Sequence, residues 1–401
     1  MRTFLSLEDA LEEMTGGLQP LGVEVLPLGE ALGRTLAEEV RAHGDQPPFD
    51  RSPLDGYALK AADTVGASPL HPVTLPVVET VYAGGIPSRG LSSGEAMRVM
   101  TGAILPSGCD CVLRLEDTDD GRETVSLYAS LRPDANFCHR GEDYSAGTLL
   151  LPAGTRLDSP SIGVLASAGV FSVPVRRRPS VGLLVTGDEI VPPERHPLPP
   201  GKIYDANLSL LTARLRELGI VDIHAAHACD SPQSVAAQME ELLHRCDLLL
   251  TTGGVSVGDK DILHQALPLM GAEPVFWKVA LKPGTPVRFS HFQGKPILSL
   301  SGNPFAAAAT FELLARPMLA ALSGESHFHL TQIQGRLQTP FPKSSPVRRF
   351  LRGRYQQGEI ILGEHHSSGV LFSMLGCNCL VELPAGASPA VPGQTVTVWL
   401  L

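Results

Sequence analysis

Residues 247–261 read Asp247-Leu-Leu-Leu-Thr-Thr-Gly253-Gly254-Val-Ser256-Val-Gly258-Asp-Lys-Asp261, an apolar run followed by a glycine-rich loop. The arrangement recurs twice downstream: residues 276–281 lead into Lys282-Pro283-Gly-Thr-Pro, and residues 296–300 lead into Ser301-Gly302-Asn303-Pro304. In an open parallel sheet, the loops after the carboxyl ends of the strands line the ligand crevice. Glycines in such loops let backbone N–H groups approach an anion closely. The sequence therefore predicts a binding site on an α/β sheet.

Residues 181–322 alternate between strand-like and helix-like runs, which is typical of a three-layer α/β domain. Polar, turn-prone residues follow each expected strand, so we expect Glu189, Asp230 and Asp261 to be near neighbours at one sheet edge. Three carboxylates in one crevice repel one another unless a cation compensates. Oxygen ligands of this kind suit Mg²⁺. Helix capping and surface turns are the alternative for any single acid, whereas the set together favours a functional site.

The glycine loop does not match the common nucleotide-binding motifs. Gly253 and Gly258 have the spacing of a Walker loop, but Asp259 stands where that motif requires lysine. An anion site is suggested instead by Lys278 and Lys282, which we expect on one face of a strand because they are four residues apart. A solvated edge strand is the alternative for this pair.

The composition favours a soluble cytoplasmic protein of several domains. A chain of 401 residues is too long for one ordinary core. We expect no apolar run that approaches the roughly 20 residues a membrane span needs, and the first residues become acidic too early for a secretory signal. The net charge is −10, and apart from Arg176-Arg-Arg178 the sequence has no basic stripe that could bind nucleic acid. We expect this short arginine run to be a solvated linker. The seven cysteines are expected to be reduced, with Cys109-Asp-Cys111 and Cys377-Asn-Cys379 in the core.

Changes in pattern along the chain predict four domains. Residues 47–146 are rich in valine, glycine and proline with short alternating runs, which indicates a β-rich domain. A helical pattern resumes after it, so the β-rich domain is expected to be an insertion. The predicted boundaries are 1–46 with 147–178 for a discontinuous, elongated α+β domain, 47–146 for the β-rich domain, 179–324 for the α/β domain, and 325–401 for a small β-barrel domain.

Eight motifs in a fixed order carry a resemblance to a known family. They are residues 48–57 (Pro-Phe-Asp-Arg-Ser-Pro-Leu-Asp55-Gly-Tyr), 100–103 (Met-Thr101-Gly-Ala), 140–143 (Arg-Gly-Glu-Asp143), 186–189 (Thr186-Gly187-Asp188-Glu189), 201–207 (Gly-Lys-Ile-Tyr-Asp-Ala-Asn), 253–258, 282–284 and 302–304. Single motifs of this length are weak, but eight in order are strong. The chain resembles the molybdopterin molybdenumtransferases of the MoeA type, to which the gephyrin E domain is similar.

The resemblance implies an activity and a set of site residues. The family hydrolyses adenylylated molybdopterin, releases AMP and inserts molybdenum from molybdate, with a divalent cation that is usually Mg²⁺. Carried over residue by residue, the implied catalytic positions are Asp55, Thr101, Asp143, Glu189, Asp230, Asp261, Lys278 and Lys282, of which Glu189 and Asp261 are the expected metal ligands. The implied substrate-binding positions are Thr186, Gly187, Asp188, Gly253, Gly254, Ser256, Gly258, Pro283, Gly302, Asn303, Pro304 and Ser368.

The chain departs from the family pattern at two places near the expected oxyanion. Thr285 replaces a lysine after Lys282-Pro-Gly, and Phe305-Ala306 replaces Val-Ser after Gly302-Asn-Pro. Each lost hydrogen bond is worth on the order of 1–3 kcal/mol, and Arg349 or Arg352 are the candidates to compensate. Two other readings stay open: a non-catalytic pterin-binding or scaffold paralogue, or an enzyme for another oxyanion such as tungstate. An adenylyltransferase of the MogA type is a third, which the extra domains disfavour.

The resemblance also implies an assembly and partners. In the family, the β-rich insertion of one subunit meets the α/β domain of another, so a homodimer with two shared sites is expected. Apolar helix faces around residues 162–170 supply a candidate contact surface. A MogA-type adenylyltransferase and molybdoenzyme apoproteins are the other partners that the family suggests.

Overall fold

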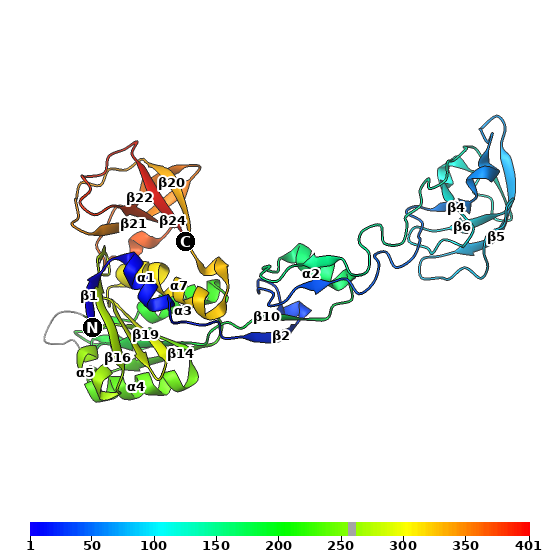
Figure 1. Ribbon diagram of the computed structural model, residues 1–401. Coiled ribbons are helices and arrows are strands. Elements are labelled where there is room, and N and C mark those ends of the chain that lie inside the picture. The colour runs from blue at the N-terminus through cyan, green and yellow to red at the C-terminus, as the bar shows by residue number, and fades with distance from the viewer. Residues whose placement is uncertain (256–261) are drawn as a thin grey trace. The chain divides into compact units, whose positions relative to one another are not determined.

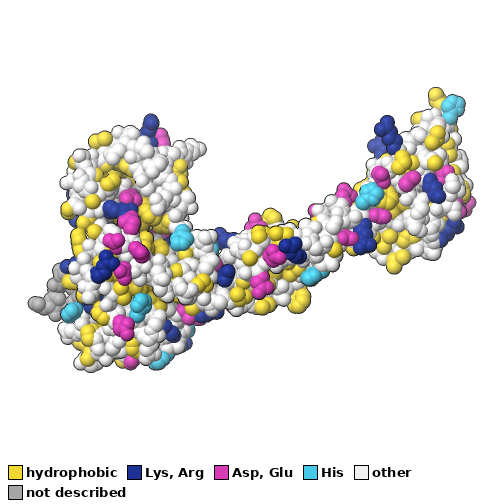
Figure 2. Space-filling view, in the orientation of Figure 1, with side chains coloured by type: hydrophobic (Ala, Val, Ile, Leu, Met, Phe, Trp, Pro, Cys, Tyr) yellow, Lys and Arg dark blue, Asp and Glu magenta, His cyan; other side chains and the backbone are white. Residues whose placement is uncertain are grey.

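The computed structural model describes residues 1–255 and 262–401. The chain divides into two compact units. The larger unit contains Met1–Glu24 and Arg176–Leu401, and the smaller unit contains Val25–Val175. On the face of the molecule seen in Figure 2, acidic and basic side chains are interspersed over both units.

A mixed sheet forms the centre of the larger unit (Figure 1). Its strand order is β1 (Arg2–Leu5), β16 (Glu273–Val279), β18 (Arg288–Phe292), β19 (Lys295–Leu300), β15 (Leu248–Thr252), β11 (Val181–Thr186) and β14 (Ile223–Ala228). The neighbours β19, β15, β11 and β14 are parallel, whereas β18 is antiparallel to both of its neighbours. The carboxyl ends of these four parallel strands therefore share one edge.

Helices cover both faces of this sheet, which makes the expected three layers. One buried cluster joins the sheet to α4 (Pro232–Arg245) and α5 (Ile262–Leu269). The other joins it to α1 (Leu7–Thr15), α3 (Asn207–Glu217), α6 (Pro304–Thr310), a π-helical turn at Phe311–Ala315, and α7 (Arg316–Ser323). Serines cap two of these helices: Ser6 accepts from the Asp9 N–H, and Ser231 accepts from the Ser234 N–H.

The first residues of the chain lie in the α/β layer rather than in the elongated domain where the sequence pattern placed residues 1–46. β1 pairs in parallel with β16, and Leu5, Leu7 and Met14 are buried in the core beneath α7. The pattern of a short strand followed by a helix fits either location. Only the pairing partner, about 270 residues away in the chain, distinguishes them.

A closed barrel ends the chain, as the sequence predicts. Its strands are β20 (Thr331–Leu337), β21 (Arg348–Gln356), β22 (Glu359–Leu362), β23 (Cys379–Leu383) and β24 (Thr395–Leu400). The barrel closes because β21 pairs with both β22 and β23. The short strand β17 (Leu281–Lys282) leaves the α/β domain and pairs in parallel with β21. Short elements η5 (Ser326–Phe328), η6 (Phe372–Met374), β12 (Ile190–Val191) and β13 (Ile203–Tyr204) complete the larger unit.

The smaller unit contains a sheet with the order β7 (Cys111–Arg114), β4 (Gly56–Leu59), β6 (Ala96–Val99), β5 (Val73–Val81) and β8 (Thr124–Leu127). Side chains that alternate along β4 enter separate cores, Tyr57 and Leu59 on one face and Ala58 on the other. A further core lies around α2 (Ser159–Ser167). Two two-stranded sheets accompany it: β2 (Val23–Pro27) pairs with β10 (Ser172–Arg176), and β3 (Val40–Arg41) pairs with β9 (Leu149–Leu151). Short 3₁₀ turns lie at Leu28–Glu30, Ala61–Thr64 and Leu115–Asp117.

Two readings of composition are wrong. The Arg176-Arg-Arg178 run is not a solvated linker, because Arg177 pairs with Asp247 at 2.9 Å and Arg178 pairs with the fully buried Glu325 at 3.1 Å. Among the described residues, one helical segment, Pro304–Ser323, is apolar and long enough to cross a membrane, although no such run was expected. It is 83% buried within the fold, which is the behaviour of a core helix.

The seven cysteines are free thiols, and Cys111 and Cys379 are buried. Burial raises the pKa of both thiols to about 12. These two side chains therefore pack as small apolar groups, which confirms the core reading for one member of each Cys-x-Cys pair.

Candidate functional site

The glycine loops meet at the shared edge of the parallel strands. Thr186 ends β11 and is buried, and Gly253 follows β15 on the neighbouring strand. A Cβ added to Gly253 would lie 2.5 Å from the Thr186 carbonyl oxygen, and the φ of Gly253 is +91°. A Cβ on Gly302, in the loop after β19, would lie 3.4 Å from the Gly253 Cα. Backbone therefore packs on backbone at this edge, and Gly253 must be glycine.

The acidic loops after β11 and β14 are joined by reciprocal hydrogen bonds. The Asp230 N–H donates to Asp188 Oδ1 at 3.0 Å, and the Asp188 N–H donates to Asp230 Oδ2 at 3.3 Å. Glu189 folds back over Gly187, where an added Cβ would lie 3.0 Å from Glu189 Oε2. Asp188 and Asp230 thus lie in contact at the edge, with Glu189 next to Asp188 in the same loop, and each aspartate keeps one oxygen outside this pair of bonds.

Three predicted positions, Ser256, Gly258 and Asp261, lie outside the described residues. Within residues 1–255 and 262–401, no cluster of three or more His, Cys, Asp or Glu side chains could hold a metal ion. The Mg²⁺ site therefore stays a prediction for Glu189 and Asp261.

Two polar groups at the same edge were not in the predicted set. The Asn207 Nδ2 donates to the Gly302 carbonyl at 2.8 Å, which ties the start of α3 to the loop after β19. Asn207 Oδ1 and Thr252 Oγ1 are buried and have no hydrogen-bond partner in the part of the chain that the structure describes. Buried polar groups are normally satisfied, so these two atoms are candidates to bind a ligand. Asn207 ends the 201–207 motif, which was the available sequence signal.

The four-residue spacing predicted that Lys278 and Lys282 share one face of a strand, and this prediction is wrong. The strand is interrupted at Ala280, so Lys278 belongs to β16 of the α/β sheet and Lys282 to β17, which pairs with the barrel. Lys278 has a φ of +71°, and its Nζ lies 4.0 Å from the centre of the Trp277 ring. The interruption separates the two ammonium groups, and only Lys282 lines the cleft described next.

That cleft has a volume of about 920 Å³ and lies between the α/β domain and the barrel within the larger unit. Its walls include the predicted residues Lys282, Pro283, Asn303 and Ser368. The Phe305 N–H donates to the Ser368 carbonyl at 3.0 Å, which fixes the 363–370 segment of the barrel against the start of α6. The structure therefore brings residues from three distant segments of the chain to one cavity.

Both departures from the family pattern also line this cleft. The Thr285 hydroxyl donates to the Leu281 carbonyl at 2.6 Å, so its hydrogen is used within its own turn. Ala306 is 1% exposed and presents no polar side-chain atom. Neither residue supplies the charge or the donor that the family pattern has there.

Arg349, one of the two candidates to compensate for these departures, supplies a cation in the cleft. It lines the cleft, is 9% exposed, and lies over the Phe341 ring at 5.2 Å. Its Nε is buried with no hydrogen-bond partner, and no carboxylate of the described residues pairs with the guanidinium. Burial lowers the pKa of Arg349. Buried cations are normally paired, so this arginine is the strongest indication of an anionic ligand.

Arg352, the other candidate to compensate, has a different role. Its Nη2 donates to the Ser367 carbonyl at 2.6 Å, its Nη1 donates to the Val370 carbonyl, and its guanidinium stacks on Phe305 at 3.9 Å. These contacts hold the 363–370 segment in place. Arg352 therefore shapes the cleft wall, whereas Arg349 is available to a ligand.

The remaining predicted residues belong to the smaller unit. Asp55 Oδ1 accepts hydrogen bonds from the Thr101 N–H and the Thr101 hydroxyl, both at 2.7 Å. The hydrogen bond from the Thr101 N–H, and to a smaller extent the one from its hydroxyl, lowers the pKa of the Asp55 carboxyl. Asp143 is exposed, and its N–H donates to the Gln46 carbonyl at 2.9 Å. Asp55 and Thr101 thus form one polar pair presented to solvent.

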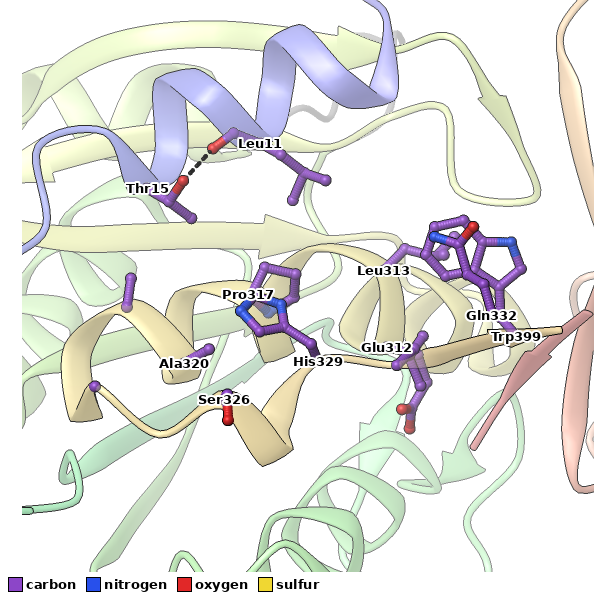
Figure 3. A pocket seen from close by; sticks show the side chains of 13 residues that line it. Leu11, Thr15, Glu312, Leu313, Pro317, Ala320, Ser326, His329, Gln332 and Trp399 are labelled. Carbon is purple, nitrogen blue, oxygen red and sulfur yellow. Dashed lines mark hydrogen bonds between the residues drawn. The ribbon is translucent and has the colours of Figure 1, made fainter. Parts of the chain in front are cut away.

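A second cavity, of about 680 Å³, lies between α1, α7 and the barrel strands β20 and β24 (Figure 3). Leu11, Leu313 and Trp399 make its walls largely apolar. The Glu312 carboxylate in its wall is paired with Arg214 at 2.6 Å and with Arg316 at 2.9 Å. None of the predicted site residues that the structure describes lines it. A largely apolar wall offers an anion little to bind, because the arginines that contact Glu312 are already paired with it. The cleft at Arg349 is therefore the candidate anion site.

Comparison with known proteins places the whole chain in one family. Family models match residues 5–169 as the MoeA N-terminal region (domains I and II), 182–321 as a "probable molybdopterin binding domain", and 334–401 as the MoeA C-terminal region (domain IV). The chain is 34% identical to the molybdopterin molybdenumtransferase of Bacillus subtilis, over 100% of this chain and 95% of that protein. The corresponding Staphylococcus epidermidis protein is 32% identical, over 100% and 96%.

Solved structures agree with these relatives. The crystal structure of a molybdopterin biosynthesis MoeA protein from Pyrococcus horikoshii superposes with a TM-score of 0.85 at 32% identity, covering 99% of both chains. A second structure of a MoeA protein from that organism gives a TM-score of 0.80 at 28% identity. With its glycine loops, its basic cleft and its closed C-terminal barrel, this chain belongs to the MoeA family of molybdopterin molybdenumtransferases.

Proposed function

We propose that this chain inserts molybdenum from molybdate into adenylylated molybdopterin and releases AMP, in a reaction that depends on a divalent cation. The observation that carries the proposal is Arg349, a buried cation that no carboxylate of residues 1–255 and 262–401 pairs with, in a cleft that Lys282 also lines. A tetrahedral oxyanion presents several acceptor oxygens, which a guanidinium and an ammonium bind from two sides.

The glycine loops suit the nucleotide part of the substrate. The loops after β11, β15 and β19 are packed so closely that no side chain stands between backbone and ligand at Gly253. Asn207 Oδ1 and Thr252 Oγ1 are enclosed at that edge and have no partner among the described residues. Asn207 Oδ1 can accept a hydrogen bond from a pterin, and the Thr252 hydroxyl can donate to a phosphate. We place the pterin nucleotide along this edge and the oxyanion in the cleft.

The carboxylates at the edge have the oxygen chemistry that Mg²⁺ prefers. Glu189, with Asp261, would hold the ion, and Asp230 lies beside Glu189 through its bonds to Asp188. When bound, the ion would supply neutralisation of the phosphate charge that develops as AMP leaves.

Replacing Glu189 by glutamine is expected to raise the Mg²⁺ concentration needed for half-maximal AMP release by about tenfold or more, because an amide keeps the size but loses the charge. Glu194→Gln, at an exposed position in the following loop, is the matched control. AMP release is measured by chromatography over a Mg²⁺ titration. Equal Mg²⁺ dependence in the two variants would remove Glu189 from the metal site.

The competing functions make a different prediction for the same assay. A binding or scaffold paralogue would bind adenylylated molybdopterin without releasing AMP, and the named enzymes among the relatives disfavour it. Incubating the chain with adenylylated molybdopterin, Mg²⁺ and either molybdate or tungstate tests the proposal directly. AMP release with molybdate supports it, whereas release with tungstate alone would assign the other oxyanion.

We further propose a homodimer in which Asp55, Thr101 and Asp143 of one subunit complete the site of the other. Exposed apolar side chains at Val164 and Phe171, on and after α2, support a contact surface in the smaller unit. The same proposal includes four domains: the elongated domain that contains residues 147–178, and domains at 47–146, 179–324 and 325–401. It also includes a cytoplasmic location and partnership with a MogA-type adenylyltransferase and molybdoenzyme apoproteins.

Mixing two inactive variants tests the shared site. Asp55→Asn and Lys282→Ala chains are each expected to be inactive, and subunit exchange should restore about a quarter of the activity, because half of the dimers are mixed and each has one intact site. Absence of recovery after exchange is confirmed by mass spectrometry, or a monomeric mass by light scattering, would contradict the proposal.

A further inference from the structure

His366 lies in the wall of the cleft that contains Arg349. Its ring meets the Phe341 ring edge-on, with centroids 5.1 Å apart, and Arg349 lies over that same phenylalanine. His366 Nδ1 is buried without a hydrogen-bond partner among the described residues. Since Nδ1 is enclosed, Nε2 is the ring nitrogen that a ligand in the cleft can reach.

The surroundings of His366 are strongly positive. β21 contributes Arg349 and Arg352, the segment before β21 contributes Lys343, the facing α/β segment contributes Lys282, and the loop of His366 itself contributes His365 and the acidic Glu364. Burial, followed by the charges of Arg352, Arg349, His365 and Lys343, lowers the pKa of His366 to about 4. The free protein therefore holds this imidazole neutral at neutral pH.

We propose that His366 is a further ligand of the oxyanion, donating from Nε2 into the cleft, and that it takes up a proton when the anion binds. The inference rests on the proposed oxyanion site at Arg349. A neutral imidazole there adds a donor without adding another unpaired cation to the empty cleft. A bound dianion reverses the local potential and favours the imidazolium form.

Linkage gives the sign of the expected pH dependence. The pKa of His366 is about 4 in the free protein and higher in the complex. Affinity is therefore lowest above the pKa of the complex and rises as pH falls below it. The rise can reach about tenfold per pH unit and ends once pH drops below the pKa of the free protein.

The test measures proton uptake during molybdate binding. Calorimetric titrations with molybdate, in buffers of different ionisation enthalpy, give the number of protons taken up per ion bound. For the wild-type chain we expect uptake at about pH 6 and a several-fold gain in affinity between about pH 8 and about pH 6. His366→Gln keeps a neutral donor but cannot be protonated, so it should lose the uptake and bind with a flat pH profile.

His244→Gln is the matched control, because His244 is an exposed histidine of α4 that does not line the cleft and is not among the charges that act on His366. It should retain the proton uptake of the wild-type chain. Persistent uptake in His366→Gln, or molybdate binding by the wild-type chain without uptake, would overturn the role of His366 while leaving the oxyanion site intact. Failure of the wild-type chain to bind molybdate at any pH would overturn both proposals. Thermal unfolding confirms that each variant is folded.

Discussion

Replacing Arg349 by methionine is expected to weaken molybdate binding by about a hundredfold, because truncating a buried partner of a charge pair costs about 2–5 kcal/mol. AMP release at limiting molybdate should fall in parallel. The same change should leave the free energy of unfolding unchanged or increase it. Arg349 is 9% exposed and has no carboxylate partner within the described part of the chain, so its removal relieves an uncompensated charge and methionine fills similar space.

This combination of lost binding with retained stability separates a ligand from a structural residue. Arg354→Met is the matched control, since Arg354 lies on the same strand and is exposed. It should bind molybdate as the wild-type chain does. Calorimetry measures the affinity for molybdate, and chemical denaturation measures the free energy of unfolding. A strongly destabilised Arg349→Met chain, or one that binds molybdate normally, would show that the cation has a structural role instead.

Replacing Gly253 by alanine is expected to lower the free energy of unfolding of the larger unit by about 2–4 kcal/mol. Its φ of +91° disfavours any side chain, and the new methyl would lie 2.5 Å from the Thr186 carbonyl oxygen. A backbone oxygen cannot rotate away as a side chain can, so the ends of β11 and β15 must separate. Binding of the pterin nucleotide at this edge should be lost with them.

Gly271→Ala separates the strain of the backbone from the steric clash. Gly271 has a φ of +74°, and an added Cβ there would meet no atom within 4 Å. Its alanine variant should therefore lose only about 1 kcal/mol. Chemical denaturation gives the stabilities, and hydrogen exchange of β11 and β15 localises the effect. Equal losses in the two variants would mean that Gly253 is needed only for its φ.

The local sequence pattern determined the elements and the loops that bear the chemistry. The serine caps at Ser6 and Ser231, the parallel strands, and the polar loops at residues 186–189 and 301–304 all follow from signals within a few residues of one another. Helix capping, side-chain periodicity and turn chemistry act over that range. The family motifs then linked these loops to a pterin nucleotide before any fold was known.

Only the tertiary structure decided which groups share a site. The sequence offered Arg349 and Arg352 only as alternatives. Arg349 lines the cleft because β21 pairs with β17 across about 67 residues. The same pairing removes Lys278 from the face of Lys282, and the pairing of β1 with β16 moves the first residues into the α/β layer. Strand pairing between distant segments depends on the packing of the whole core, and a local pattern fits more than one partner.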